Sequence, residues 1–384
     1  MLKTLQNAFK IKEVREKLLY TFFMLVVTRI GSQLPIPGVN TTFFQELFTR
    51  QSNDAFGFFN TITGGSFTNM SVFALSITPY ITSSIIMQLL TIAIPKLEEM
   101  QQEGEDGRKK ITAITRYVTI FLAVIESLGL VIGFDRGHYM TVTGPLGYLL
   151  VIITLTTGSA FVMWLGERVT EKGVGNGISI ILLINIVSRM PSDFSDLYTK
   201  FMKGQDIVDQ VIAGAIILAV ILVTTILVVL LQGGVRKIPV QHAQKVQGRR
   251  MMGGQQSHIP LKVNTSSVIP VIFASSILSV PMVVVNLFNI NTSGVWAKIL
   301  RGMNSNYWFN PAYPWASVGL IIYILLVVFF AYFYTSVTFN PMEVANNLKK
   351  SGGFIPGIRP GKPTQDYLNK ILNYIVFIGA VGLL

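Results

Sequence analysis

Cysteine is absent from this chain of 384 residues, and charged side chains make up only 13% of it. The missing cysteine excludes disulfides and thiolate metal sites. The low charge, combined with 51% hydrophobic residues, excludes an ordinary soluble domain, in which about a quarter of the residues are charged. Acidic residues are scarcer than basic ones, 19 against 31 Lys and Arg. We therefore expect a basic membrane protein.

Catalytic patterns are also missing. The three histidines, His138, His242 and His258, fall in predicted loops and have no metal-ligand partner at helical spacing. Ser159, in TGSAF, lacks the flanking residues of a nucleophile turn, and no GxxxxGKS/T phosphate loop occurs. We therefore expect neither an enzyme nor a resident metal or cofactor, and energy for the protein's work must come from outside the chain.

Hydrophobic runs of about twenty residues, the length of a membrane-crossing helix, recur along the chain. They predict nine spans: Leu18 to Leu34, Met70 to Ile94, Ile111 to Phe134, Leu146 to Leu165, Ile178 to Met190, Ile207 to Leu231, Val263 to Phe288, Trp315 to Phe339 and Tyr367 to Leu384. The fifth is unusually short. The ninth is still apolar at its last residue, so we expect the chain to stop inside a span and a tenth span to be missing.

Lysine and arginine are distributed unevenly between the predicted loops. If the N-terminus is cytoplasmic and the spans alternate, 21 of these residues lie on the inside and 7 in the outer loops. This bias predicts that orientation. Residues 1–17 place apolar side chains at roughly helical spacing among basic ones and lack the pattern of a signal peptide. They predict an amphipathic helix on the cytoplasmic membrane surface.

Two of the predicted inside loops are basic. Residues 232–262 hold six Lys or Arg and no acidic residue. Either the positive-inside rule alone produces this excess, or the loop docks an acidic protein or RNA. In residues 340–366, glycines and prolines prevent a continuous helix. This second loop is either a plain connector or a shaped turn that presents Arg359 and Lys362.

The second span has an unusual composition. FALSITPYITSSIIMQLL, residues 73–90, carries Pro79 and several hydroxyls where a lipid-facing helix would be apolar. A mid-span proline frees a carbonyl, which a membrane tolerates only where protein or a water-lined cavity satisfies it. Packing of small polar residues between helices is the simpler explanation. The seventh span repeats the pattern in VNTSSVIPVIFASSILSVP, with Pro270 in the place of Pro79.

Corresponding proline-interrupted spans in two halves predict a central pathway between inverted repeats. The stretch AFGFFNTITGGSFTN, before the second span, is either a re-entrant segment that lines a cavity or an ordinary loop with a hydrophobic cap. A channel and an inverted-repeat secondary transporter of a small solute both fit this pattern. A transporter is expected to place polar or charged ligands beside the prolines, whereas the flanking residues here are largely aliphatic.

Long motifs carry a closer likeness: RIGSQLPIPG, GGSFTNMSVFALSITPYITSSIIMQLL, EGEDGRKKITAITRY, WLGERVTEKGVGNGISI, QGRRMMGGQQSHIPLKVNTSSVIPVIFASSI and FNPMEVANNLKKSGGFIPGIRPGKPT. Through these motifs the chain resembles the SecY family, the central channel subunits of the bacterial protein translocase, from its first span to its last residue. The resemblance implies an all-α polytopic membrane fold of ten helices in two inverted halves of five, with the last helix absent here.

The resemblance also implies a function and a division of the chain. The expected protein is a channel that passes unfolded secretory polypeptides across the membrane and releases hydrophobic segments sideways into lipid through a lateral gate. A secondary transporter is the alternative. Residues 18–190 would be the N-terminal half, 191–206 an external hinge loop, and 207–384 the C-terminal half with cytoplasmic loops 232–262 and 340–366.

Site residues follow from the same resemblance. The aliphatic ring that narrows the pore would consist of Ile77, Ile81, Ile178, Leu182 and Ile272. The plug, about residues 56–69, would include Phe56, Phe58, Phe59, Ile62, Gly64 and Gly65. The lateral gate would include Thr78, Gln88, Asn176, Ser275 and Ser276. The motor and the ribosome would dock on Arg236, Lys237, Lys245, Arg249, Arg250, Arg359 and Lys362, with Arg359 serving productive motor engagement.

Partners and location are implied as well. The resemblance predicts SecE and SecG as companion subunits, and the SecA motor ATPase and the ribosome as cytoplasmic partners. Signal peptides, unfolded preproteins and membrane lipids would contact the pathway itself. The chain would be a multi-pass protein of the plasma membrane of a bacterium, with its N-terminus in the cytoplasm.

Overall fold

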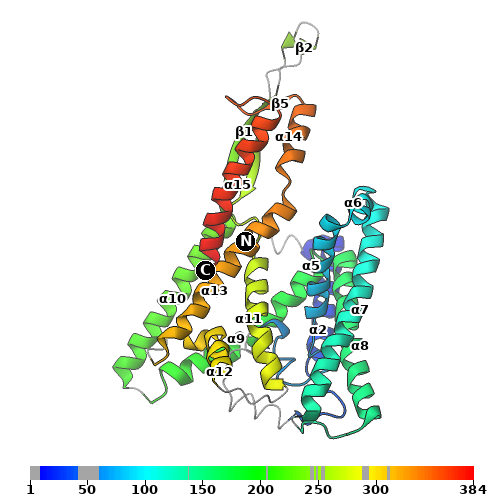
Figure 1. Ribbon diagram of the computed structural model, residues 1–384, viewed down its shortest axis with the longest axis vertical. Coiled ribbons are helices and arrows are strands. Elements are labelled where there is room, and N and C mark those ends of the chain that lie inside the picture. The colour runs from blue at the N-terminus through cyan, green and yellow to red at the C-terminus, as the bar shows by residue number, and fades with distance from the viewer. Residues whose placement is uncertain are drawn as a thin grey trace. The chain divides into compact units, whose positions relative to one another are not determined.

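The computed structural model describes residues 9–41, 60–136, 138–204, 206–242, 246–247, 250–251, 256–287, 294–308 and 312–384 (Figure 1). The chain divides into two units, each with its own packing. Unit 1 comprises residues 1–200 and 279–300, and unit 2 comprises residues 201–278 and 301–384.

Unit 1 is built from helices: α2 (Lys12–Gly31), α5 (Thr78–Ala93), α6 (Pro95–Gln102), α7 (Glu105–Arg136), α8 (Pro145–Lys172) and α9 (Gly177–Phe201). Unit 2 holds α10 (Ile207–Gly233), β1 (Val235–His242), β2 (Val246–Gln247), β3 (Arg250–Met251), β4 (Gln256–Lys262), η1 (Ser305–Tyr307), η2 (Pro314–Ser317), α13 (Val318–Thr338), α14 (Pro341–Lys350), β5 (Gly353–Phe354) and α15 (Lys362–Leu383). The helices α11 (Ile269–Leu287) and α12 (Val295–Met303) are divided between the units.

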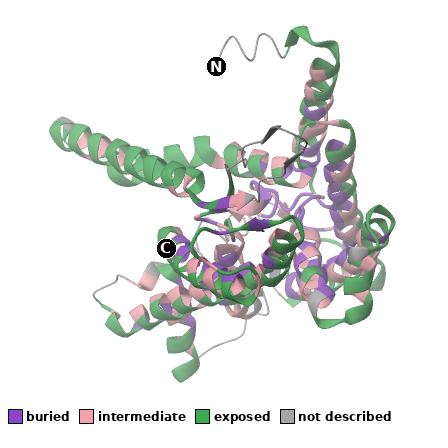
Figure 2. Cartoon of the chain, turned by 90° about the horizontal axis from the view of Figure 1, so that it is seen from above, coloured by how far each residue is buried: buried purple, intermediate pink, exposed green. Residues whose placement is uncertain are grey.

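Each of the nine predicted spans overlaps a helix, though the bounds differ. Among the described residues, five helices are long and apolar enough to cross a membrane, and a sixth span results if α5 and α6, bent by 104°, count as one. Apolar side chains stay exposed on the outer faces of these helices. In the most apolar stretch of α10, for example, no residue is buried. Figure 2 shows buried residues gathered where elements pack and exposed ones on the outer faces. Such outer faces suit lipid rather than water.

The two prolines that predicted broken spans instead begin helices. Pro79 occupies the first turn of α5, and residues 70–77 before it are turns, so the predicted span from Met70 is not helical in its first part. Pro270 is the second residue of α11. The first turn of a helix has no intrahelical partner for its N–H groups, so proline costs no hydrogen bond there. The expectation of a freed mid-span carbonyl at Pro79 is therefore wrong.

The internal repeat is visible in the backbone. Ser76 has φ 49° and lies three residues before Pro79, and Ser267 has φ 56° and lies three residues before Pro270. Positive φ is uncommon for residues other than glycine. The same left-handed turn therefore precedes the helix in both halves, as the paired motifs predict.

The fifth span is longer than predicted. Helix α9 continues through Pro191 to Phe201. The span was predicted to end at Met190, with residues 191–206 forming a loop. Those residues are helical as far as Phe201, so only the remainder connects α9 to α10.

The core of unit 1 depends on close backbone approach. A Cβ on Gly158 of α8 would lie 2.0 Å from the carbonyl oxygen of Val72, so only glycine permits this contact. Around it, buried residues from the segment before α5, from α7 and from α8 form one cluster that includes Met70, Leu130 and Leu155. This packing fixes the irregular segment 66–77 against α8.

Unit 2 contains a small antiparallel sheet in the strand order β4-β1-β5. β1 and β4 come from the basic loop 232–262, which is a hairpin rather than an open loop, and β5 comes from the second basic loop. Figure 1 shows β1 and β5 beside α14 and α15. The sheet packs through Ile238, Leu261 and Ile355 against Leu368 and Ile375 of α15.

Candidate functional site

Four of the five predicted ring residues lie in one apolar cluster of unit 1. Ile77 is fully buried there, while Ile81, Ile178 and Leu182 are half-buried and pack against it. Ile81 follows Ile77 by four residues at the start of α5, and Leu182 follows Ile178 by four in α9, so each pair shares one helix face. Ile272, the fifth, is half-buried on α11 in unit 2.

The cluster is formed mainly by aliphatic side chains. Phe73, Val162, Leu165 and Ile181 form its remaining buried part. The half-buried members keep part of their side chains exposed, whereas Ile77 is fully buried and the others pack against its cluster. If these residues line a pore, as predicted, an apolar constriction could exclude water and ions by dewetting.

The described part of the predicted plug packs on α9. Residues 60–63 form a helical turn, which ends at Gly64 and Gly65, both with positive φ. The side-chain amide of Asn185 in α9 donates to the carbonyl of Ile62 at 3.3 Å. Phe56, Phe58 and Phe59 lie outside the described residues.

The predicted gate residues differ in environment. The hydroxyl of Thr78 is buried and has no hydrogen-bond partner among the described residues. Gln88 is exposed and lines a hollow of about 370 Å³ together with Ser84, Arg108 and Thr112. Ser275 and Ser276 are half-buried on α11.

Asn176 has a local structural task at the start of α9. Its side-chain oxygen accepts hydrogen bonds from the backbone N–H groups of Ile178 and Ser179, at 3.0 and 3.2 Å. It therefore caps the helix that carries two ring residues. Asn176 was predicted to lie near the lateral gate. Its capping contact was not predicted.

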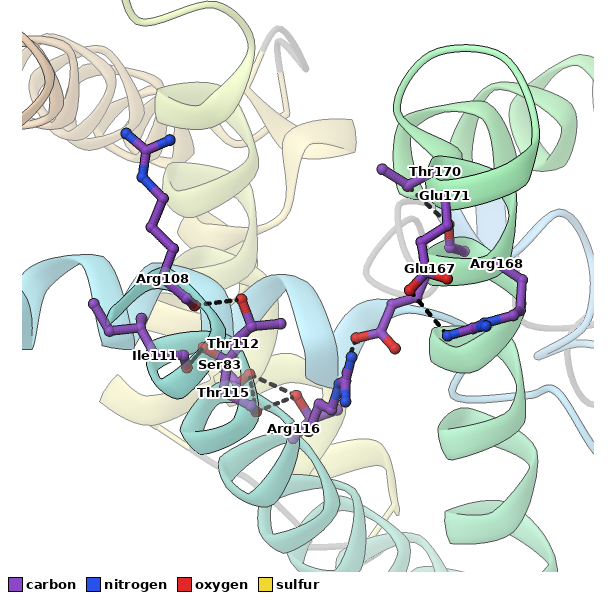
Figure 3. A network of polar contacts seen from close by, with 12 residues as sticks. Ser83, Arg108, Ile111, Thr112, Thr115, Arg116, Glu167, Arg168, Thr170 and Glu171 are labelled. Carbon is purple, nitrogen blue, oxygen red and sulfur yellow. Dashed lines mark hydrogen bonds and ion pairs between the residues drawn. The ribbon is translucent and has the colours of Figure 1, made fainter. Parts of the chain in front are cut away.

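A polar network joins α5, α7 and α8 (Figure 3). The Ser83 hydroxyl of α5 lies 2.6 Å from that of Thr119 and donates to the Thr115 carbonyl of α7 at 3.1 Å. Arg116 of α7 forms an ion pair with Glu167 of α8 at 2.7 Å. These contacts tie α5, α7 and α8 into one body.

Four of the seven predicted docking residues have described side chains. Arg236 and Lys237 are exposed on β1. Arg359 is exposed on the turn between β5 and α15, and Lys362 is the exposed first residue of α15. The buried Thr364 hydroxyl of α15 donates to the Arg359 carbonyl at 2.8 Å. These four side chains form no ion pair within the described part of the chain. Lys245, Arg249 and the side chain of Arg250 lie outside it.

Two residues that contact the predicted plug, Asn185 and Arg29, are not among the site residues predicted from the sequence. Arg29 of α2 donates to the carbonyl of Gly64 at 3.3 Å. The signal that could have found both is a polar side chain inside an apolar run. In the described residues, no group of three His, Asp or Glu side chains could hold a metal ion.

The comparisons with known proteins agree with this arrangement. The profile of the SecY family matches residues 71–384. The chain is 42% identical over 388 residues to the protein translocase subunit SecY of Halalkalibacterium halodurans. The alignment covers 100% of this chain and 87% of that protein. It is 41% identical over 389 residues to the protein of the same name from Bacillus subtilis, with the same coverage.

Solved structures share the fold. A structure described as a protein conducting channel aligns with a TM-score of 0.60 at 21% identity, over 99% of this chain and 89% of that one. A SecY protein whose plug domain is described as stabilising the closed state aligns with a TM-score of 0.58 at 20% identity, over 99% and 88%. Sec61 in the canine ribosome-channel complex aligns with a TM-score of 0.55 at 19% identity, over 99% and 89%.

These likenesses confirm the all-α channel fold that the resemblance implied. They also confirm a multi-pass membrane protein with bacterial relatives, and they do not favour the transporter alternative. The family profile covers most of the chain, and the bacterial relatives cover all of it. The chain therefore belongs to the SecY family of protein translocase subunits.

Proposed function

We propose that this chain conducts unfolded polypeptides across the plasma membrane and that its ring residues form the constriction of the pore. The observation that carries the proposal is the apolar cluster in which Ile77, Ile81, Ile178 and Leu182 meet. The corresponding position in the second half is Ile272, beside the second left-handed serine turn. The N-terminus is proposed to be cytoplasmic, because most lysines and arginines then lie inside.

Aliphatic residues suit such a pathway for a physical reason. A pore that passes many sequences must not hold any of them, and fixed polar contacts would do so. Aliphatic side chains form a narrow seal that excludes water without binding the chain. The Thr78 hydroxyl, which has no partner among the described residues, and the exposed Gln88 fit a gate seam whose contacts are weak. A hydrogen bond between membrane helices stabilises by about 0.6 kcal/mol on average.

A trapped secretory polypeptide tests the pore directly. Single cysteines at Ile81, Leu182 and Ile272 of the full-length protein should each form a disulfide with a cysteine in a polypeptide stalled midway. These 384 residues contain no cysteine, so none of them competes for the oxidation. The adducts would be detected by gel mobility after oxidation.

The control for this experiment is a cysteine at Val220, which is 56% exposed on the apolar helix α10. It should give no adduct. Equal adduct yields at Val220 and at the ring positions, or none at any of them, would contradict the proposed pore.

We further propose that the sheet of unit 2 and the turn after it dock cytoplasmic partners, namely the ribosome and the SecA motor. The sheet joins two basic loops that are about a hundred residues apart in sequence, and it presents Arg236, Lys237, Arg359 and Lys362 without competing ion pairs among the described residues. Ribosomal RNA phosphates attract such a surface independently of sequence. SecE and SecG are proposed as companion subunits on the resemblance alone.

Charge reversal tests the docking surface. The double variant Arg236→Glu/Lys237→Glu should weaken ribosome binding to membrane vesicles by roughly tenfold at moderate salt and flatten its salt dependence, because two phosphate contacts are lost. Cosedimentation at several salt concentrations measures both quantities.

The matched control is Lys298→Glu/Arg301→Glu. It changes the same net charge on exposed residues of α12, which lies in a predicted outer loop. Ribosome binding by this variant should match that of the unchanged protein. If both double variants weaken binding equally, the effect comes from net charge and the docking surface lies elsewhere.

A further inference from the structure

Asn185 places a buried amide in the middle of an otherwise apolar span. The residue is 2% exposed, and its Nδ2 donates in two directions. One hydrogen bond reaches the carbonyl of Ile62 at 3.3 Å, and the other reaches the hydroxyl of Ser76 at 3.1 Å. A single side chain therefore contacts both the plug segment and the turn that leads into α5.

Ser76 is the residue that directly precedes ring residue Ile77. Its backbone has φ 49°, and its carbonyl accepts a hydrogen bond from the Ser159 hydroxyl of α8 at 3.1 Å. Ser267 repeats the positive φ in the second half, so the turn itself belongs to the repeat. The hydrogen bond from Asn185 is the contact that links this turn to the plug.

The plug segment approaches the same point of α9 very closely. A Cβ on Gly64 would lie 2.8 Å from Cα of Asn185 and 2.9 Å from its carbonyl oxygen. Gly64 also has φ 65°, which disfavours side chains. Arg29 of α2 donates to the Gly64 carbonyl at 3.3 Å. The segment 62–64 is thus clamped between α2 and α9.

We propose that Asn185 is a positioning residue that latches the plug to the pore ring in the closed channel. The inference rests on the proposed function of residues 56–69 as plug. Asn185 lies one turn from Ile181 and Leu182, so movement of the ring pulls on its amide. Departure of the plug breaks the bond to Ile62, and widening of the ring breaks the bond to Ser76.

The latch couples the two movements because it is buried. If only one of the two bonds breaks, a donor or an acceptor loses its partner away from water, which is costly. When both hydrogen bonds break together, the Ile62 carbonyl moves away with the plug and can bind water in the open channel. The closed and open states are therefore favoured over intermediate ones.

The test uses a thiol probe on the plug. Thr63 is 2% exposed, so a Thr63→Cys probe should react slowly with a membrane-impermeant maleimide applied outside the vesicles. In the Asn185→Leu background, which preserves volume but removes both donors, the reaction should be roughly five- to tenfold faster. Ion conductance without substrate should rise with it.

Two further variants make the outcome decisive. Ser127→Ala is the control, because it removes a fully buried hydroxyl of α7 that donates to the Val124 carbonyl and lies 3.4 Å from the Thr156 hydroxyl. This variant should leave the labelling rate and the conductance unchanged. Gly64→Val should displace the plug sterically and raise both readouts whatever Asn185 does. Rising readouts for Gly64→Val but unchanged ones for Asn185→Leu would overturn the latch and leave the plug standing. Unchanged readouts for both would overturn the plug as well.

A third variant covers poor accumulation of Asn185→Leu. Ser76→Ala removes only the acceptor of one of the two bonds, and should accelerate labelling by about threefold. No acceleration would contradict the latch. In the double variant with Asn185→Leu, the Ser76→Ala change should add nothing, because the bond it removes is already gone.

Discussion

Replacing Gly158 by valine is expected to destabilise unit 1 by roughly 3 kcal/mol or more. The new Cβ would lie 2.0 Å from the Val72 carbonyl oxygen and 2.9 Å from its carbon. These atoms are backbone, so no side-chain rotation relieves the overlap, and α8 must move away from the segment that leads to Ile77. The thermal midpoint of the purified protein and its abundance in membranes should both fall sharply.

Gly129→Val is the matched control for this change. Gly129 lies on α7, and a Cβ there meets no atom within 4 Å. We expect a change of less than about 0.5 kcal/mol, as for surface substitutions generally. Similar losses for the two variants would mean that valine harms these helices through its helix propensity, and the close contact between α8 and Val72 would then carry little of the stability of unit 1.

Truncating Ile238 to alanine is expected to cost about 2–4 kcal/mol and to weaken cytoplasmic docking. Ile238 is 2% exposed and belongs to the cluster that packs the sheet onto α15. Its loss leaves a cavity beneath β1, the strand that carries Arg236 and Lys237. Ribosome affinity should therefore fall although no charge has changed, and the thermal midpoint should fall with it.

Val235→Ala provides the comparison on the same strand. Val235 is 41% exposed, so its truncation creates no cavity, and both stability and ribosome affinity should remain close to those of the unchanged protein. If Ile238→Ala lowers stability but leaves affinity intact, the basic side chains dock without the support of the sheet. Proteolysis of the 235–262 hairpin in vesicles would show whether the strand has loosened.

The class of the protein and its membrane spans were predictable from the sequence because they depend on local composition. A run of about twenty apolar residues buries itself in lipid whatever its neighbours are, so each predicted span overlaps a helix. The basic loops were predictable for the same reason. The ring candidates were recognised from motif resemblance, and their spacing of four residues places each pair on one helix face.

Helix boundaries were less predictable, because they depend on which backbone groups find partners. Pro79 sits in a long apolar stretch, and composition alone does not distinguish a broken helix from one that begins there. The start at Thr78 is decided by the left-handed turn at Ser76, whose carbonyl and hydroxyl are satisfied by Ser159 and Asn185. Similarly, α9 continues through Pro191, where the sequence suggested a loop.

Pairings between distant segments came from the tertiary structure alone. The sequence determined that this is a multi-pass membrane protein with two basic loops and two matching halves. It did not show that β1 and β5 join those loops in one sheet, or that Asn185 reaches both Ile62 and Ser76. The physical reason is that hydrophobicity and charge act residue by residue, whereas strand register and a hydrogen bond across more than a hundred residues exist only once the chain is packed.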